Sequence, residues 1–184
     1  MKEAHSRGSA PDELLVDRAR NGDSEAMDEL VKRHHASAFR VALGVLREED
    51  GAADATQDAF LKAFRGLGTF RGDASFKTWL LTIVTNEARG LLRKRGRRKE
   101  LDLEAAGPVV SSEANAEDAL QHAQEADRIR ALLEELPEKQ RQAVTLRVFE
   151  GMSFREVGAL IGSSEGAARV NYHHGIRRIR EMLG

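Results

Sequence analysis

Apolar residues recur every three or four positions over most of the chain, the spacing of helices that bury one face. The longest such pattern follows a cap at Asp23 or Ser24 and comprises Ala26, Leu30, Val31, His34, Ala38, Val41 and Leu43. Further helices are expected from Asp12 to Arg20, from about Ala53 to Leu67, and from near Ser75 to Lys99. Polar residues from Glu48 to Ala52 predict a turn. No useful strand alternation is present, so the pattern predicts an all-α protein.

The segment from Leu136 to Leu183 carries three short amphipathic patterns. Ser153 and Glu156 have the spacing of a capping box, in which each side chain hydrogen-bonds the other residue's backbone. Gly162 permits a sharp turn, and Ser163 or Ser164 is expected to cap the last helix, with Glu165 in its first turn. This arrangement predicts a helix-turn-helix whose last helix enters a DNA major groove.

Periodicity is lost between these two regions, where Gly107-Pro108 and Ser111-Ser112 interrupt the pattern. A helix is expected to resume near Ala116. We therefore predict two small helical domains joined by a flexible acidic linker, the C-terminal domain being the helix-turn-helix. The expected segments are a disordered stretch at 1–10, a domain at 11–99, the linker at 100–126 and a domain at 127–184.

Charge is distributed unevenly, although the formal net charge is only −1. Residues 89–99 contain seven Lys or Arg and no acid, whereas residues 100–126 contain seven acids and no Lys or Arg. A basic block of this density predicts contact with phosphates and a steep salt dependence of binding. The acidic block is interpreted as a solvated spacer or as a mimic of nucleic acid.

Several classes of protein are excluded or disfavoured by composition. The chain has no cysteine, which removes disulfides and thiolate metal sites. No signal peptide or membrane-spanning apolar run is apparent, so we expect a cytoplasmic protein without membrane insertion. The adjacent pairs His34-His35 and His173-His174 are a poor chelating geometry, and no metal site or cofactor is predicted. No nucleophile–base pair or phosphate-binding glycine loop indicates an enzyme.

Three motifs occur in a fixed order: DATQDAFLKAFRGL from Asp54, FRGDASFKTWLLTIVTNEARGLLRKRGRR from Phe70, and LPEKQRQAVTLRVFEGMSFREVGALIGSSEGAARV from Leu136. Together they resemble RNA polymerase sigma factors of the small extracytoplasmic-function group, over nearly the whole chain. The resemblance implies a subunit that binds core RNA polymerase and directs it to promoters. It also implies an anti-sigma protein as a regulator and a linker that passes near the polymerase active centre.

The resemblance implies a polymerase-binding helix face that docks on the clamp coiled coil of the largest subunit. A solvated helix face is the alternative for these charged residues. A second polymerase contact, with the flap, is implied for the chain as a whole. The residues that match the docking face are Asp54, Gln57, Asp58 and Leu61.

The resemblance further implies that the loop after this helix captures a flipped base of the promoter −10 element. Phe70 lies among glycines and suits stacking on a base, which is worth about 1–3 kcal/mol, whereas core packing is the main role expected of Phe76 and Trp79. The −10 candidates are Phe70, Arg71, Lys77, Trp79, Asn86, Arg89 and Arg93.

In the last helix the resemblance implies recognition of the promoter −35 element. Arginine suits guanine and asparagine suits adenine by bidentate geometry. The −35 candidates are Ser164, Arg169, Asn171, His173, His174, Arg177 and Arg178. Asn171, Gly175 and Ile176 depart from the family pattern and are expected to mark this protein's own specificity. The alternative function is a helix-turn-helix regulator that binds duplex DNA without being a polymerase subunit.

Overall fold

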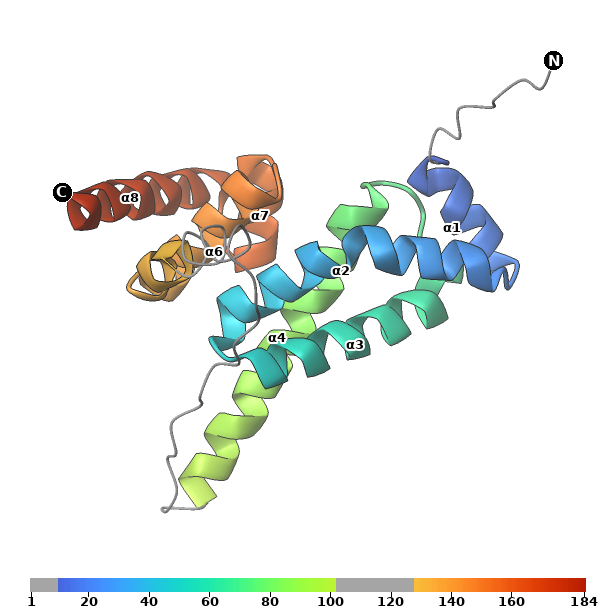
Figure 1. The fold of residues 1–184 in the computed structure, drawn as a ribbon, viewed down its shortest axis with the longest axis horizontal. Helices are drawn as coiled ribbons and strands as arrows, with labels where there is room; N and C mark the ends of the chain where they lie inside the picture. Colours follow the sequence, from blue (N-terminus) through green and yellow to red (C-terminus); the bar gives the residue numbers. More distant parts are fainter. Residues whose placement is uncertain (1–9, 102–127) are drawn as a thin grey trace, which may run out of the picture.

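A computed structural model describes residues 10–101 and 128–184, and within these ranges every regular element is a helix (Figure 1). The all-α prediction is confirmed. Residues 1–9 of the expected disordered N-terminus and residues 102–126 of the expected linker lie outside the described residues, whereas Glu100 and Leu101, predicted to start the linker, belong to α4. The elements are α1 (Asp12–Arg20), α2 (Ser24–Leu46), α3 (Glu49–Gly66), η1 (Leu67–Thr69), α4 (Phe76–Leu101), α6 (Glu138–Val144), η2 (Thr145–Phe149), α7 (Phe154–Ile161) and α8 (Glu165–Leu183).

Helices α1 to α4 pack around one core. The side chain of Asp23 accepts a hydrogen bond from the Ala26 amide and caps α2, as predicted. Leu30, Leu80 and Leu81 are completely buried where α2 and α4 meet the other helices. Small residues on α3, among them Ala55, Ala59 and Ala63, are also fully buried and let the neighbouring helices approach closely.

The predicted turn at 48–52 is wrong, because α3 already begins at Glu49. Gly51 and Ala52 are buried inside the helix, and a Cβ at Gly51 would overlap the Glu48 carboxylate. Glu48 in turn pairs with Arg95 of α4, 2.5 Å away. A glycine that suggests a helix breaker in the sequence thus lies inside a helix, where it leaves room for the Glu48 and Arg95 side chains.

Residues 128–134 are helical and lead into the C-terminal helices. Helix α6 continues into η2, a π-helical turn that the sequence did not predict. Helices α7 and α8 form the predicted helix-turn-helix and pack on α6. Arg141 of α6 is buried and donates to the Gly44 carbonyl of α2, 2.7 Å away.

The two groups of helices lie against each other, with α6 and α7 beside α2 and α4. Leu146, Val157 and Leu160 belong to the same buried apolar cluster as the core of α1 to α4. In this arrangement the two predicted domains are therefore closely packed.

Candidate functional site

The outer face of α3 presents the residues predicted to bind polymerase. Asp54, Gln57, Asp58 and Leu61 are all exposed, Leu61 to 47%. Their spacing places them along neighbouring rows of one helix surface, opposite the buried alanines. An exposed leucine among acids and an amide is a surface suited to a basic, partly apolar partner. This set is called the α3 face below.

Phe70 does not project freely from its loop. Its ring lies 5.0 Å from that of Trp79 and 6.2 Å from that of Phe76, in an aromatic cluster packed on the core. Arg20 donates to the Leu67 carbonyl at 3.0 Å and to the Phe70 carbonyl, and its guanidinium lies 6.0 Å from the Phe70 ring. Phe70, like Trp79, is therefore packed against neighbouring side chains rather than exposed. A base could stack on Phe70 only after the loop rearranges.

Arg71, Gly72 and Asp73 form the exposed part of this loop, and Gly72 has a φ of 78°. The sequence did not single out Arg20 as a residue that anchors the loop. Its only signal was its position in the last turn of the first helix. Arg20 holds both ends of the segment 67–70 and therefore fixes where the exposed residues begin.

The −10 candidates on α4 fall into two groups. Asn86 and Arg93 are exposed. Lys77 and Arg89 are instead engaged by the C-terminal helices: Lys77 Nζ lies 2.9 Å from Glu150 Oε2, and Arg89 Nη1 donates to the Leu160 carbonyl at 2.7 Å. Only part of the predicted DNA-binding set is accessible in this arrangement.

The turn between α7 and α8 has the predicted geometry. Ser153 and Glu156 form the capping box, and Gly162 ends α7 with a φ of 65°. Ser164, rather than Ser163, caps α8 by accepting from the Ala167 amide at 3.2 Å. A Cβ at Gly158 would lie 3.0 Å from the Ser163 carbonyl oxygen, so this glycine permits the tight approach of the turn to α7.

The −35 candidates on α8 lie along two stripes. Arg169, His173 and Arg177 follow one another at intervals of four, while Asn171, His174 and Arg178 follow at three and four. All are exposed except Asn171, whose side-chain amide donates to the Ala167 carbonyl at 2.8 Å.

Two of the expected specificity positions have other roles in the structure. Gly175 is buried against α6, where an added Cβ would lie 2.7 Å from Val144 Cγ2. The expectation is wrong for Gly175, because only a hydrogen fits at that contact. Ile176 is half-buried and lines an apolar groove with Val144, Val148 and Leu183.

Phe154, which the sequence analysis did not select, lies at the base of the predicted DNA-reading surface. The guanidinium carbons of Arg169 and Arg147 lie 4.9 and 5.0 Å from the centroid of its ring. Cation–π contacts of this kind contribute about 0.5–1 kcal/mol at exposed sites. Arg169 also pairs with Glu165 at 3.2 Å. Phe154 and Glu165 together restrict Arg169, a candidate for base contact.

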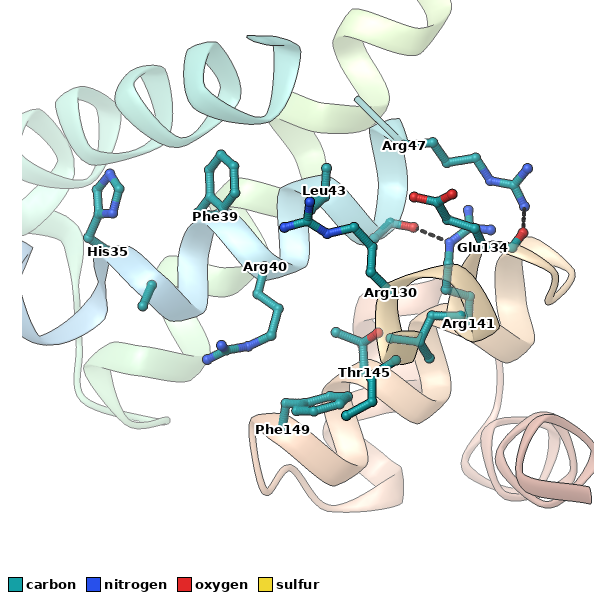
Figure 2. A pocket seen from close by; sticks show the side chains of 14 residues that line it. His35, Phe39, Arg40, Leu43, Arg47, Arg130, Glu134, Arg141, Thr145 and Phe149 are labelled. Atoms are coloured by element: carbon teal, nitrogen blue, oxygen red, sulfur yellow. Dashed lines mark hydrogen bonds between the residues drawn. The ribbon is translucent and has the colours of Figure 1, made fainter. Parts of the chain in front are cut away.

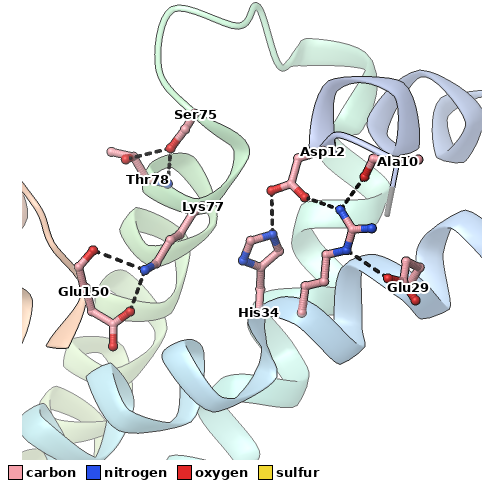
Figure 3. Close-up of polar contacts among 9 residues, drawn as sticks. Ala10, Asp12, Glu29, His34, Ser75, Lys77, Thr78 and Glu150 are labelled. Carbon is pink, nitrogen blue, oxygen red and sulfur yellow. Dashed lines mark hydrogen bonds and ion pairs between the residues drawn. The ribbon is translucent and has the colours of Figure 1, made fainter. Parts of the chain in front are cut away.

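One histidine of each predicted pair has a defined contact within the fold. His34 is buried, and its Nε2 lies 2.7 Å from Asp12 Oδ2 (Figure 3). His173 packs at the edge of the aromatic rings of Phe154 and Tyr172. Among residues 10–101 and 128–184, no three His, Asp or Glu side chains gather in a metal-binding group.

A groove of about 560 Å³ separates α2 from the C-terminal helices (Figure 2). Its apolar lining comprises Phe39, Leu43, Ile129, Leu133 and Phe149. Its cationic lining comprises Arg40, Arg47, Arg130 and Arg141. Burial, together with the nearby Arg47, lowers the pKa of Arg141 to about 10. The groove thus combines apolar side chains with four arginines and one acid, Glu134.

Comparison with known proteins agrees with this geometry. Residues 30–98 match the family model described as Sigma-70 region 2, and residues 126–179 match Sigma-70, region 4. The ECF RNA polymerase sigma-E factor of Escherichia coli (strain K12) is 32% identical over 180 residues, covering 94% of this chain and 92% of the relative. The chain belongs to the sigma-70 family, in its extracytoplasmic-function (ECF) group.

Two solved structures share the fold of this sigma factor. CnrH in complex with the cytosolic domain of CnrY is 26% identical, with a TM-score of 0.65 and coverage of 94% of this chain and 96% of that chain. The sigma factor RpoE in complex with the anti-sigma factor NepR from Bartonella quintana is 23% identical, with a TM-score of 0.68 and coverage of 85% and 95%.

Family membership gives the function at a general level. The sigma factor binds core RNA polymerase and directs it to promoters for transcription initiation. Members of this family are initiation factors rather than enzymes. Among the described residues, no helix is both long and apolar enough to cross a bilayer.

Proposed function

We propose that this sigma factor grips the promoter at two points, with residues 11–99 acting on the −10 element and residues 127–184 on the −35 element. Residues 100–126 connect the two domains. The observation that carries this proposal is the position of its two polar surfaces on separate groups of helices. The −10 candidates lie on α4 and its preceding loop, and the −35 candidates lie on α8.

The α3 face is the proposed docking site for the clamp coiled coil of the largest polymerase subunit. Its support is the exposure of all four residues. Two exposed carboxylates around an exposed leucine favour a partner that brings cations and apolar surface together.

The polymerase flap is the proposed partner of a second apolar groove, on the C-terminal helices. This groove of about 430 Å³ is lined by Leu132, Val148, Phe149, Ile179 and Leu183, among others. Val148 and Leu183 are 52% and 50% exposed. Apolar side chains left in water at this density favour burial by a partner helix.

At the −10 element, exposed Asn86 and Arg93 and the engaged Lys77 and Arg89 are proposed to contact the opened strand. The segment 69–73 is proposed to take the flipped base. Flipping costs a few kcal/mol, which base contacts of about 1–3 kcal/mol per stacked base offset together with phosphate contacts. This balance permits melting without ATP.

At the −35 element, α8 is proposed to enter the major groove. Arg169 and Asn171 have side chains that suit guanine and adenine, and Arg177 and Arg178 are placed to contact phosphates. Because Asn171 already donates to the Ala167 carbonyl, its remaining amide donor and its carbonyl oxygen are available for a base.

An anti-sigma protein is the proposed regulator, and the groove between α2 and the C-terminal helices is its proposed site. The support is the combination of apolar side chains with four arginines. An amphipathic helix carrying acids matches both properties. Two proteins of this fold were solved with a partner, in one case an anti-sigma factor.

The test of the proposed function is run-off transcription with purified core polymerase and no other sigma factor. The template carries a promoter defined by the start sites that appear when the chain is overexpressed. We expect a specific transcript that core polymerase alone does not produce. A transcript that requires a second sigma factor would instead support the alternative of a helix-turn-helix regulator.

A further inference from the structure

One apolar side chain lies on the outer, polar face of α8. Val170 is 53% exposed. An α-helix turns about 100° per residue, so Val170 lies roughly 160° from Ala168 and roughly 140° from Gly175 around the helix axis. Ala168 and Gly175 are the buried residues of α8. Val170 therefore points almost directly away from the core of the C-terminal helices, on the side that is proposed to face DNA.

Polar side chains surround Val170 on this face. Arg169 precedes it, His173 and His174 follow at three and four positions, and Arg177 follows at seven. All four of these residues are exposed. Val170 is thus a single apolar side chain among cations and imidazoles.

Other exposed apolar residues of the C-terminal helices form a different surface. Val148, Phe149 and Leu183 line the groove of about 430 Å³, to which Val170 does not belong. A protein partner draws its affinity from clustered apolar anchors, and Val170 offers only one. The surroundings of Val170 instead favour a partner that is anionic and polar except for one small apolar group.

The major groove of DNA has this composition. Its base edges present hydrogen-bond donors and acceptors, and among the four unmodified bases thymine alone adds a methyl group, on C5. Valine offers no hydrogen bond from its side chain, but it can bury a methyl group. Thymine is therefore the base that the chemistry of Val170 fits.

The backbone next to Val170 leaves room for a close approach of the duplex. Side chains of a helix lean toward its N-terminus, so Val170 leans over Gly166, one turn earlier. Gly166 is exposed, and a Cβ built there would meet nothing within 4 Å. No side chain at this position separates Val170 from DNA. Because a β-branched side chain has one strongly preferred rotamer in a helix, its methyl groups are already fixed before DNA binds.

We propose that Val170 reads a thymine of the promoter −35 element by packing against the 5-methyl group of that base. Val170 is in the second turn of α8, and recognition helices contact base edges with their N-terminal residues. Arg169 supplies hydrogen bonds beside it, and Val170 adds selection for thymine. This inference rests on the proposed entry of α8 into the major groove, and it adds a residue that the sequence analysis did not select.

The experiment removes the methyl group from the DNA and the valine from the protein, separately and together. The promoter fragment is the one defined by the start sites that appear on overexpression. Each thymine of its −35 element is replaced in turn by deoxyuridine, which lacks only the 5-methyl group. Holoenzyme reconstituted with core polymerase carries the wild-type chain or Val170→Ala, and competition against a labelled, unmodified fragment measures affinity. Met182→Ala, at a residue that is 37% exposed farther along α8, is the matched control.

We expect one deoxyuridine replacement to weaken binding by the wild-type holoenzyme roughly fourfold, the effect of removing one buried methyl-sized group. The same replacement is expected to change the affinity of Val170→Ala by less than roughly 1.5-fold, because the methyl group has already lost its partner. Met182→Ala is expected to respond to deoxyuridine as the wild type does. Val170→Ala is exposed and is expected to keep the helicity of the wild type by circular dichroism; Val170→Ser repeats the test if it does not.

Failure of this inference is distinguishable from failure of the proposed function. An equal response of the wild type and Val170→Ala to every replacement, or a −35 element without thymine in either strand, would overturn the role of Val170. Weaker binding by Arg169→Ala in that case would leave the proposed role of α8 intact. Unchanged affinity in both Arg169→Ala and Val170→Ala would overturn the entry of α8 into the major groove as well.

Discussion

Two helices of the N-terminal domain carry predicted interaction residues, and only one of them is open. The α3 face is exposed over its whole length. On α4, by contrast, Lys77 and Arg89 are occupied by the C-terminal helices while Asn86 and Arg93 are accessible. The difference shows that the proposed polymerase-binding residues are accessible in this arrangement, whereas two of the proposed DNA-binding cations contact the C-terminal helices.

The largest expected effect comes from the core that α3 and α4 share. Leu80 is completely buried, and Leu80→Ala is expected to destabilise the fold by about 2–5 kcal/mol through lost burial and a cavity. Urea denaturation measures this change. We expect polymerase binding by α3 and DNA binding by α4 to be lost together. Loss of polymerase binding alone would contradict the view that one core supports both helices.

Charge reversal on the α3 face is expected to act on polymerase alone. Asp58→Lys is predicted to weaken binding to core polymerase roughly tenfold, about 1.4 kcal/mol, by placing like charges at the interface. Fluorescence anisotropy with labelled sigma factor measures it. Asp28→Lys, an exposed acid on α2, is the matched control. Equal losses in the two variants would argue for a general charge effect.

The salt dependence of DNA binding distinguishes accessible cations on α4 from cations that already contact the C-terminal helices. We expect Arg93→Gln to reduce the slope of log affinity for DNA against log salt concentration by about one, because one phosphate contact is lost. Lys77→Gln is expected to leave the wild-type slope nearly unchanged and to reduce it by about one in a Glu150→Gln background. A full effect of Lys77→Gln in the wild type would contradict the contact between Lys77 and Glu150.

A smaller effect is expected where Phe154 restrains Arg169. Phe154→Leu keeps apolar volume and removes the cation–π contact, worth about 0.5–1 kcal/mol, so binding to the −35 duplex is expected to weaken a few-fold. Titration of a duplex that carries the mapped −35 element measures it. In an Arg169→Ala background the same substitution is expected to have little further effect, and additive losses would exclude coupling through Arg169.

The smallest expected effect concerns pH. Burial raises the pKa of Glu150, but hydrogen bonds from Lys77, Arg40 and Ser37 outweigh it and hold the pKa below its ordinary value. Because the pKa of Glu150 is lower in the folded state than in the unfolded state, its ionised carboxylate stabilises the folded chain above the unfolded pKa. This contribution is lost as pH falls through the folded pKa.

The difference in free energy of unfolding between the wild type and Glu150→Gln, measured by urea denaturation, is therefore expected to stay constant between about pH 5 and pH 8 and to shrink only in stronger acid. A change in this difference near neutral pH would contradict a lowered pKa of Glu150.

Local signals in the sequence predicted the local structure well. The capping box at Ser153 and Glu156, the turn at Gly162 and the Asp23 cap are contacts between residues a few positions apart, and all are confirmed. The start of α3 was missed because the polar residues around Gly51 suggest a turn. Burial of Gly51 and Ala52 inside the helix depends on packing against other helices.

The predictions of functional residues also succeeded where they depended on local pattern and failed where they depended on tertiary packing. Exposure of the α3 face followed from its periodicity, because a helix with one apolar face leaves the other in water. Packing of Phe70 on Trp79, by contrast, depends on how a glycine-rich loop folds back on α4. We predicted that Gly175 marks the DNA specificity of this protein. Its contact with Val144 of α6 instead makes it a packing residue.

The sequence by itself determined the helices, the helix-turn-helix and membership of the ECF group, because these depend on spacing, caps and motifs along the chain. Only the tertiary structure decided which of the predicted cations are free. Glu150 lies 110 residues from Arg40 along the chain and 73 from Lys77. No local pattern relates residues so far apart, and their pairing arises only when the two domains bury a carboxylate between them.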